Sequence, residues 1–116
     1  MDKIMSKDPD FLICTTEVPQ GYKLVKVLGI AWGSEVKAKS AKGSAAATLR
    51  GFLGGNVPEL QNMAMEARRG SVDKMVQQAR KMGANGVVGV SLTGFTFRHD
   101  IVEFIAYGTA VIVEKA

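Results

Sequence analysis

The sequence has one cysteine, one histidine and one tryptophan among 116 residues, and aromatic residues make up 7% of it. Cys14 alone cannot form an internal disulfide, so we expect a reducing compartment, the cytoplasm. No apolar run reaches the roughly 18 residues that a membrane span needs. The N-terminal residues are charged and lack the apolar stretch of a secretory signal. Cys-x-x-Cys pairs and paired histidines are absent, which excludes the common zinc-finger patterns.

What the sequence does contain is typical of a folded protein. Hydrophobic residues make up 47% and charged residues 22%, with a formal net charge of +4. This length and composition fit one globular domain. We expect a flexible N-terminus over 1–10 and a single domain over 11–116.

The hydrophobic pattern predicts an α+β protein with one long helix. Apolar residues recur at spacings of three to five over 59–82, with polar residues between them and Gly83 as a helix stop. Gly70-Ser71 weakens the middle of this helix and allows a kink there. The other expected elements are a β-prone run at 11–16, strands at 22–32, 34–39, 87–97 and 101–113, and a short helix at 45–53. The order strand, helix, strand, strand predicts a mainly antiparallel sheet packed on the helix.

Two of the predicted strands are apolar on both sides. Over 101–113 only Glu103, Gly108 and Thr109 interrupt the apolar residues, and 22–32 is similar apart from two lysines. One long helix can cover one face of a small sheet, so the other face needs a second cover. Another copy of the chain is the simplest cover. The alternative is a monomer in which residues 34–58 fold over the open face.

Positive charge is concentrated between residues 36 and 58, where no acidic residue occurs. The basic residues of this segment are Lys37, Lys39, Lys42 and Arg50. With the nearby glycines they form a candidate site for a small anion. The alternative is a solvated loop. Nucleic acid is not an expected partner, because Phe52 is the one aromatic residue available for stacking in this segment.

Few residues offer metal or catalytic chemistry. Cys14, His99 and Glu103 are the candidate metal ligands, with Glu17 as a further carboxylate. The alternatives are a small buried thiol, a solvated turn histidine and a salt bridge across a subunit boundary. Glu103 and Tyr107 are the residues around which an active site at a subunit interface could form.

Several segments together resemble the YbjQ family, from about residue 11 to the C-terminus. The most distinctive are Gly-Ala-Asn-Gly-Val-Val-Gly-Val at 83–90 and Ala-Tyr-Gly-Thr-Ala-Val at 106–111. The others lie at 15–22, 28–30 and 50–55, and Gly70-Ser71 departs from the family pattern.

The resemblance implies a fold like the dodecin subunit, a homopentameric ring or a stacked decamer, and a heavy-metal-binding label. It implies no enzymatic reaction. We therefore expect a ring-forming binding or scaffold protein whose ligand is a metal ion or small anion. The rival hypothesis is an enzyme with an active site at the subunit interface around Glu103 and Tyr107.

Overall fold

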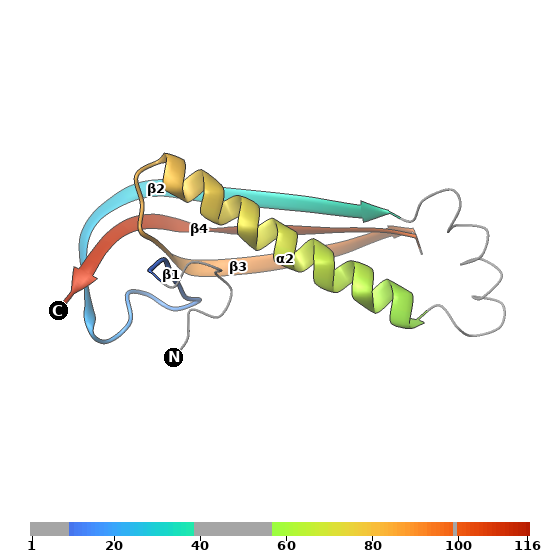
Figure 1. Ribbon diagram of the computed structural model, residues 1–116, viewed down its shortest axis with the longest axis horizontal. Helices are drawn as coiled ribbons and strands as arrows, with labels where there is room; N and C mark the ends of the chain where they lie inside the picture. The colour runs from blue at the N-terminus through green and yellow to red at the C-terminus, as the bar shows by residue number, and fades with distance from the viewer. Residues whose placement is uncertain (1–9, 39–56, 99) are drawn as a thin grey trace.

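The computed structural model describes residues 10–38, 57–98 and 100–116. Their elements form a four-stranded sheet in the order β1-β3-β4-β2, crossed on one side by the long helix α2 (Figure 1). The elements are β1 (Leu12–Ile13), β2 (Tyr22–Ala38), α2 (Val57–Lys81), β3 (Gly86–Arg98) and β4 (Ile101–Lys115). The expected α+β class and the order strand, helix, strand, strand are confirmed.

The β2–β4 and β3–β4 pairings are antiparallel, so the sheet is mainly antiparallel as expected, and β1 adds a short parallel pairing with β3. Two details differ from the prediction. The segment 22–38 is one strand, although Gly33 was expected to end a first strand there. The helix α2 also continues through Gly70-Ser71. The expectations for residues 1–9, the helix at 45–53 and His99 lie outside the described residues.

Gly33 lies within β2 because the helix packs directly on the strand at this point. A Cβ atom at Gly33 would overlap the carbonyl oxygen of Ser71 and the amide nitrogen of Met75. The absence of a side chain therefore permits the closest approach of the two elements, which is a packing role.

Antiparallel pairing along β4 decides which residues share each face of the sheet. Ala31 pairs with Gly108 and Gly33 with Ala106, and these small residues lie under α2. Trp32 pairs with Tyr107 on the opposite face, because successive side chains alternate. Register shifts near Leu24 and Val27 interrupt this alternation at the start of β2.

The main core lies between the sheet and the C-terminal half of α2. The buried members are Phe11, Ile13, Ala31, Val72, Met75, Val76, Ala79, Ala84, Val87, Val90, Ala106 and Ala110. A second small cluster of Leu12, Val88, Val111 and Val113 lies against Cys14, Val18 and Tyr22. The segment after β1 therefore supplies partial cover at one end of the sheet.

The chain turns from α2 into β3 through the segment 83–86. Gly83 adopts φ +93°, a conformation that favours glycine after a helix end. The Asn85 side chain then donates to the Val113 carbonyl and accepts from the Val113 amide, both at 2.9 Å. Asn85 thus satisfies both backbone groups of one β4 residue, as a neighbouring strand would. Among the described residues, no helix combines the length and the apolar character required to span a bilayer.

Candidate functional site

The face of the sheet opposite α2 carries an apolar surface, which we call the open face. Its solvent-exposed apolar side chains are between 39% and 60% exposed. They are Ile30, Trp32 and Val36 of β2, Phe95 and Phe97 of β3, and Tyr107 of β4. The half-buried Ile101 and Ile105 of β4 lie between them in the sheet. No element of the described structure covers this surface, and a contiguous group of exposed apolar side chains commonly marks an interaction site.

Two pairs of aromatic side chains contact each other on the open face. The rings of Trp32 and Tyr107 lie 5.3 Å apart and tilted by 35°, across the β2–β4 pairing. The rings of Phe95 and Phe97 are stacked at 6.5 Å, so both lie on one side of β3. Large aromatic side chains held in this way are typical of the centres of protein interfaces.

A cavity of about 620 Å³ lies where the open face meets the edge of β2. It is lined by Trp32, Gly33, Ser34, Lys74, Gln78, Glu103 and Ile105. The Gln78 side chain accepts a hydrogen bond from the Trp32 amide, so a helix residue occupies one backbone donor of the exposed edge. The edge of β2 at Trp32 is therefore partly protected from pairing with another strand.

Glu103 of β4 is a charged residue on the open face. It is half-buried and pairs in register with Val36 and Phe95, both apolar. Tyr107 lies on the same face with Ile105 between them, and no hydrogen bond joins the two within the described structure. Glu103 and Tyr107 therefore share the open face, but the single chain does not bring their polar atoms together.

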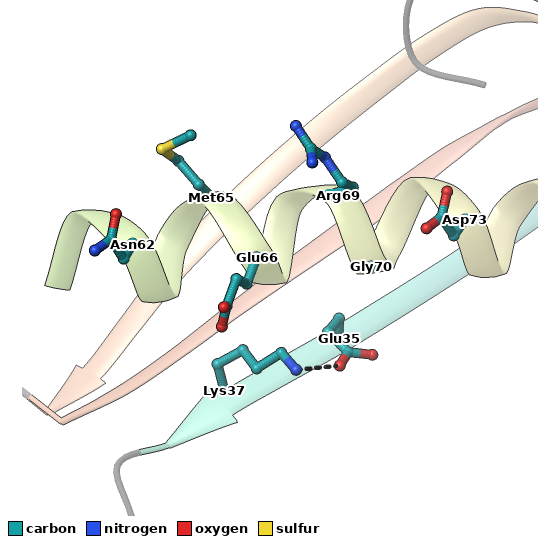
Figure 2. Close-up of a pocket in the computed structure, with 8 residues that line it drawn as sticks. All are labelled: Glu35, Lys37, Asn62, Met65, Glu66, Arg69, Gly70 and Asp73. Atoms are coloured by element: carbon teal, nitrogen blue, oxygen red, sulfur yellow. Dashed lines mark ion pairs between the residues drawn. The ribbon is translucent and has the colours of Figure 1, made fainter. Parts of the chain in front are cut away.

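A second groove lies on the helix side, between the N-terminal half of α2 and the end of β2 (Figure 2). Lys37 lies in this groove and forms an ion pair with Glu35 at 3.4 Å. Lys74 is closer to the same carboxylate, at 2.6 Å. The hydrogen bond from Lys74, and then the one from Lys37, hold the pKa of Glu35 below its ordinary value.

This geometry bears on the predicted anion site. The charge of Lys37 is compensated by Glu35, and Glu66 and Asp73 also line the groove. The remaining members of the predicted patch, Lys39, Lys42 and Arg50, lie outside the described residues.

The predicted metal ligands do not form a cluster within one described chain. The Cys14 thiol donates weakly to the carbonyls of Thr16 and Glu17, at 3.4 and 3.5 Å. Its backbone pairs with Val87 and Val90, whereas Glu103 pairs with Phe95, farther along β3. His99 lies outside the described residues. Over 10–38, 57–98 and 100–116, no three His, Cys, Asp or Glu residues lie close enough to hold a metal ion.

Sequence reasoning missed the cluster of Glu35, Gly70 and Lys74. A Cβ atom at Gly70 would lie 2.8 Å from the Glu35 Cγ, so the glycine makes room for the glutamate side chain. The signal was present as the unusual Gly70-Ser71 within a helical pattern. The reason for this glycine is its contact with Glu35, a residue of β2 that lies 35 positions earlier in the sequence.

Comparisons with known proteins agree on one family. The YbjQ family model, described as "Putative heavy-metal-binding", matches residues 11–114. A UPF0145 protein of Sulfurisphaera tokodaii is 36% identical over 95% of this chain and 96% of its own length. A UPF0145 protein of Thermococcus kodakarensis is 41% identical over 90% of this chain and 92% of its own length.

A solved structure shares the fold at much lower identity. It is a protein of unknown function of the DUF74 family from Pediococcus pentosaceus, with a TM-score of 0.58 and 12% identity. The match covers 90% of this chain and 98% of that one. The match to the family model over residues 11–114 and the relatives at 36% and 41% identity show that the chain belongs to the YbjQ family.

Proposed function

We propose that this protein is a self-assembling binding or scaffold protein, in which neighbouring copies cover the open face. The observation that carries the proposal is the apolar surface around Trp32 and Phe97, on the side of the sheet that α2 leaves uncovered. Burial of apolar surface is favourable by about 25 cal/mol per Å². Each copy therefore gains stability when this surface leaves water.

The expected assembly is a ring with cyclic symmetry, most simply of five copies or two stacked rings. The number five and the likeness to the dodecin subunit come from the family resemblance. A ring requires a head-to-tail contact, in which the open face of one copy packs against a different surface of the next copy.

The mass of the assembly in solution tests this proposal. Analytical ultracentrifugation of the wild type should give several times the chain mass of 12.4 kDa, with five copies as the expected number. Ile30→Lys, which places a charge on the open face at a 57% exposed position, should shift the protein to monomer.

The matched control is Leu92→Lys. Leu92 lies in the same sheet and is 38% exposed, but it pairs with Ala106 and therefore faces the helix side. This variant should keep the wild-type mass. A wild type that stays monomeric at micromolar concentration, or an Ile30→Lys variant that assembles normally, contradicts the proposal.

The ligand we propose for the assembly is a metal ion or a small anion. The family description supports the metal, but the described residues of one chain provide no ligand set, so its ligands would have to come from more than one copy. Equilibrium dialysis with zinc and copper should then show metal retained by the wild-type assembly and lost in Cys14→Ser. Equal retention by both proteins contradicts the role of the thiol.

A second candidate function is an active site enclosed at the subunit interface. It is favoured by the position of Glu103 and Tyr107 on the face that a neighbour would cover. A screen of hydrolytic reactions with the wild type and Tyr107→Phe tests it. Turnover that disappears in the variant while the mass is unchanged supports an enzyme, and the absence of turnover in the wild type leaves the binding protein as the function.

A further inference from the structure

The sheet has two outer strand edges, and one of them runs along β3. The strand order β1-β3-β4-β2 places β2 at one side of the sheet. On the other side, β1 and the residues after it bond to β3 only as far as Val90, although β3 continues to Arg98. Residues 91–97 are all exposed, and β4 is their one partner strand within the described structure. The outer edge of β3 at 91–97 therefore has no described neighbour.

The pairing register shows which backbone amides of β3 point to this edge. The Trp32 amide of β2 points away from β4, where it donates to the side chain of Gln78. Tyr107 pairs with Trp32, so its backbone groups point the other way, toward Ser91 of β3. Backbone groups alternate along a strand, so the amides that point away from β4 are those of Leu92, Gly94 and Thr96. Over the described ranges, no residue accepts a hydrogen bond from these amides.

The two edges differ in how they are protected from pairing with another strand. The edge strand β2 carries several lysines, and its Trp32 amide is occupied by Gln78. Charged side chains and occupied backbone groups are the usual protection of an edge strand. In contrast, the sequence from 83 to 97 contains no charged residue and no proline. An edge without such protection is suited to pairing with a further strand.

A second copy of β3 is the partner strand that fits this edge best. Antiparallel pairing of β3 with itself joins two uncharged edges, whereas pairing with β2 meets its lysines and the occupied Trp32 amide. If the pairing is centred on Gly94, Phe95 of each copy lies opposite Thr93 of the other. Pairs of an aromatic and a β-branched residue across two strands are favourable. The open faces of the two copies then lie side by side as one continuous surface.

We propose that the edge of β3 at 91–97 pairs antiparallel with the same edge of a second copy, and that this pairing joins two rings. The inference rests on the proposed self-assembly and adds a contact of different, two-fold symmetry. A single pairing of this length is weak, but several such pairings between two rings act together. Ile30→Lys, which prevents the ring, therefore still gives the monomer.

Sedimentation of the full chain over a range of concentrations tests this pairing. The wild type should change from the ring to a particle of twice the mass as the concentration rises. Thr96→Pro removes an amide that points away from β4, so it blocks the outer edge and leaves the β3–β4 pairing in place. This variant should form the ring and should not double its mass at any concentration.

Two variants are matched controls for Thr96→Pro. Thr96→Val keeps the backbone amide and the branched side chain, so it should double its mass like the wild type. Ser34→Pro removes an amide that points outward from the edge of β2, two positions after Trp32, and should also double. Loss of doubling in Ser34→Pro but not in Thr96→Pro would assign the contact to β2 and overturn the proposal.

Amide hydrogen exchange of the wild type is a measurement that needs no variant. The amides of Leu92, Gly94 and Thr96 should exchange slowly in the doubled particle and rapidly in the single ring. Slow exchange in the single ring would show that the edge is already covered there, which contradicts the pairing between rings.

The outcomes separate this inference from the proposed function. A wild type that is monomeric at every concentration overturns both. A ring that never doubles, or that doubles equally well in Thr96→Pro, overturns the β3 pairing alone. A pair of copies that Thr96→Pro dissociates and Ile30→Lys leaves intact overturns the ring and supports the β3 pairing. Circular dichroism of each variant confirms that the chain still folds.

Discussion

Glu35 shows how one residue connects the two layers of this protein. Its side chain is 18% exposed and lies between β2 and α2, held by Lys74 and Lys37. These partners are 56% and 39% exposed, so the ion pairs remain in contact with water. We therefore expect a contribution of about 1 kcal/mol to the free energy of unfolding, the upper end for pairs at a surface.

This contribution should depend on pH in a defined direction. The pKa of Glu35 is lowered in the folded protein from an ordinary value of 4.5, chiefly by the hydrogen bond from Lys74. The stabilisation is therefore fully present above pH about 4.5, and it is lost as the pH falls through the folded-state value. Urea unfolding should show Glu35→Gln less stable than the wild type at neutral pH, with the difference disappearing in acid.

Lys74→Gln is the complementary variant for this prediction. It removes the largest cause of the pKa shift and should reduce the same acid-dependent part of the stability. A difference between wild type and Glu35→Gln that stays constant from pH 7 to about pH 3 would contradict the role of this cluster.

At the scale of elements, the contact between α2 and β2 depends on Gly33. A methyl group there would overlap backbone atoms of Ser71 and Met75, and backbone cannot move aside as a flexible side chain can. We expect Gly33→Ala to separate the helix from the strand and to lower the free energy of unfolding by about 3 kcal/mol. Ser34→Ala, at an exposed position next to it, should change the stability little. Thermal unfolding of both variants provides the comparison, and a Gly33→Ala variant as stable as the wild type would show that the layers pack less closely.

A second contact between the same elements couples Gly70 to Glu35. Alanine is favoured over glycine within a helix by about 1 kcal/mol. In the wild type a steric contact opposes this gain in helix stability, because the new Cβ would lie 2.8 Å from the Glu35 Cγ. We expect Gly70→Ala to stabilise the protein clearly in a Glu35→Ala background and less, or not at all, in the wild type. A double-mutant cycle by urea unfolding measures this coupling, and equal effects in both backgrounds would exclude it.

The elements themselves were largely predictable from the sequence, and the reasons are physical. The helix and the β3–β4 hairpin have strong local periodicity, so the sequence predicted their first and last residues to within a few positions. β2 was divided at Gly33 because a glycine in a strand signals an end, whereas here it serves a contact with residues far along the chain. Bulges near Leu24 and Val27 also changed which apolar residues share a face, and alternation alone cannot predict them.

The candidate site was predictable only in part, for a related reason. The two-sided apolar pattern of β4 correctly indicated a sheet face that α2 leaves uncovered. The engagement of Lys37 by Glu35 and the separation of Cys14 from Glu103 depend on tertiary contacts. Spacing in the sequence carries no information about such contacts.

At the scale of the whole molecule, Trp32 reports directly on whether the open face is covered. It is the one tryptophan of the chain, and it is 52% exposed on this face beside Tyr107. An indole in water emits at longer wavelength than an indole buried in an apolar interface. The emission of the wild type should therefore lie at shorter wavelength when assembled and move to longer wavelength on dilution.

The Ile30→Lys variant supplies the monomeric reference for this measurement, because it retains Trp32 but should not assemble. Its emission should be at long wavelength at every concentration and should match the limit reached by the diluted wild type. The midpoint of the wild-type shift gives the dissociation constant of the contact and should agree with sedimentation. If Trp32 emits as a solvated indole in a particle of several chain masses, the copies associate through a different surface. The apolar side of the sheet would then have to serve another partner.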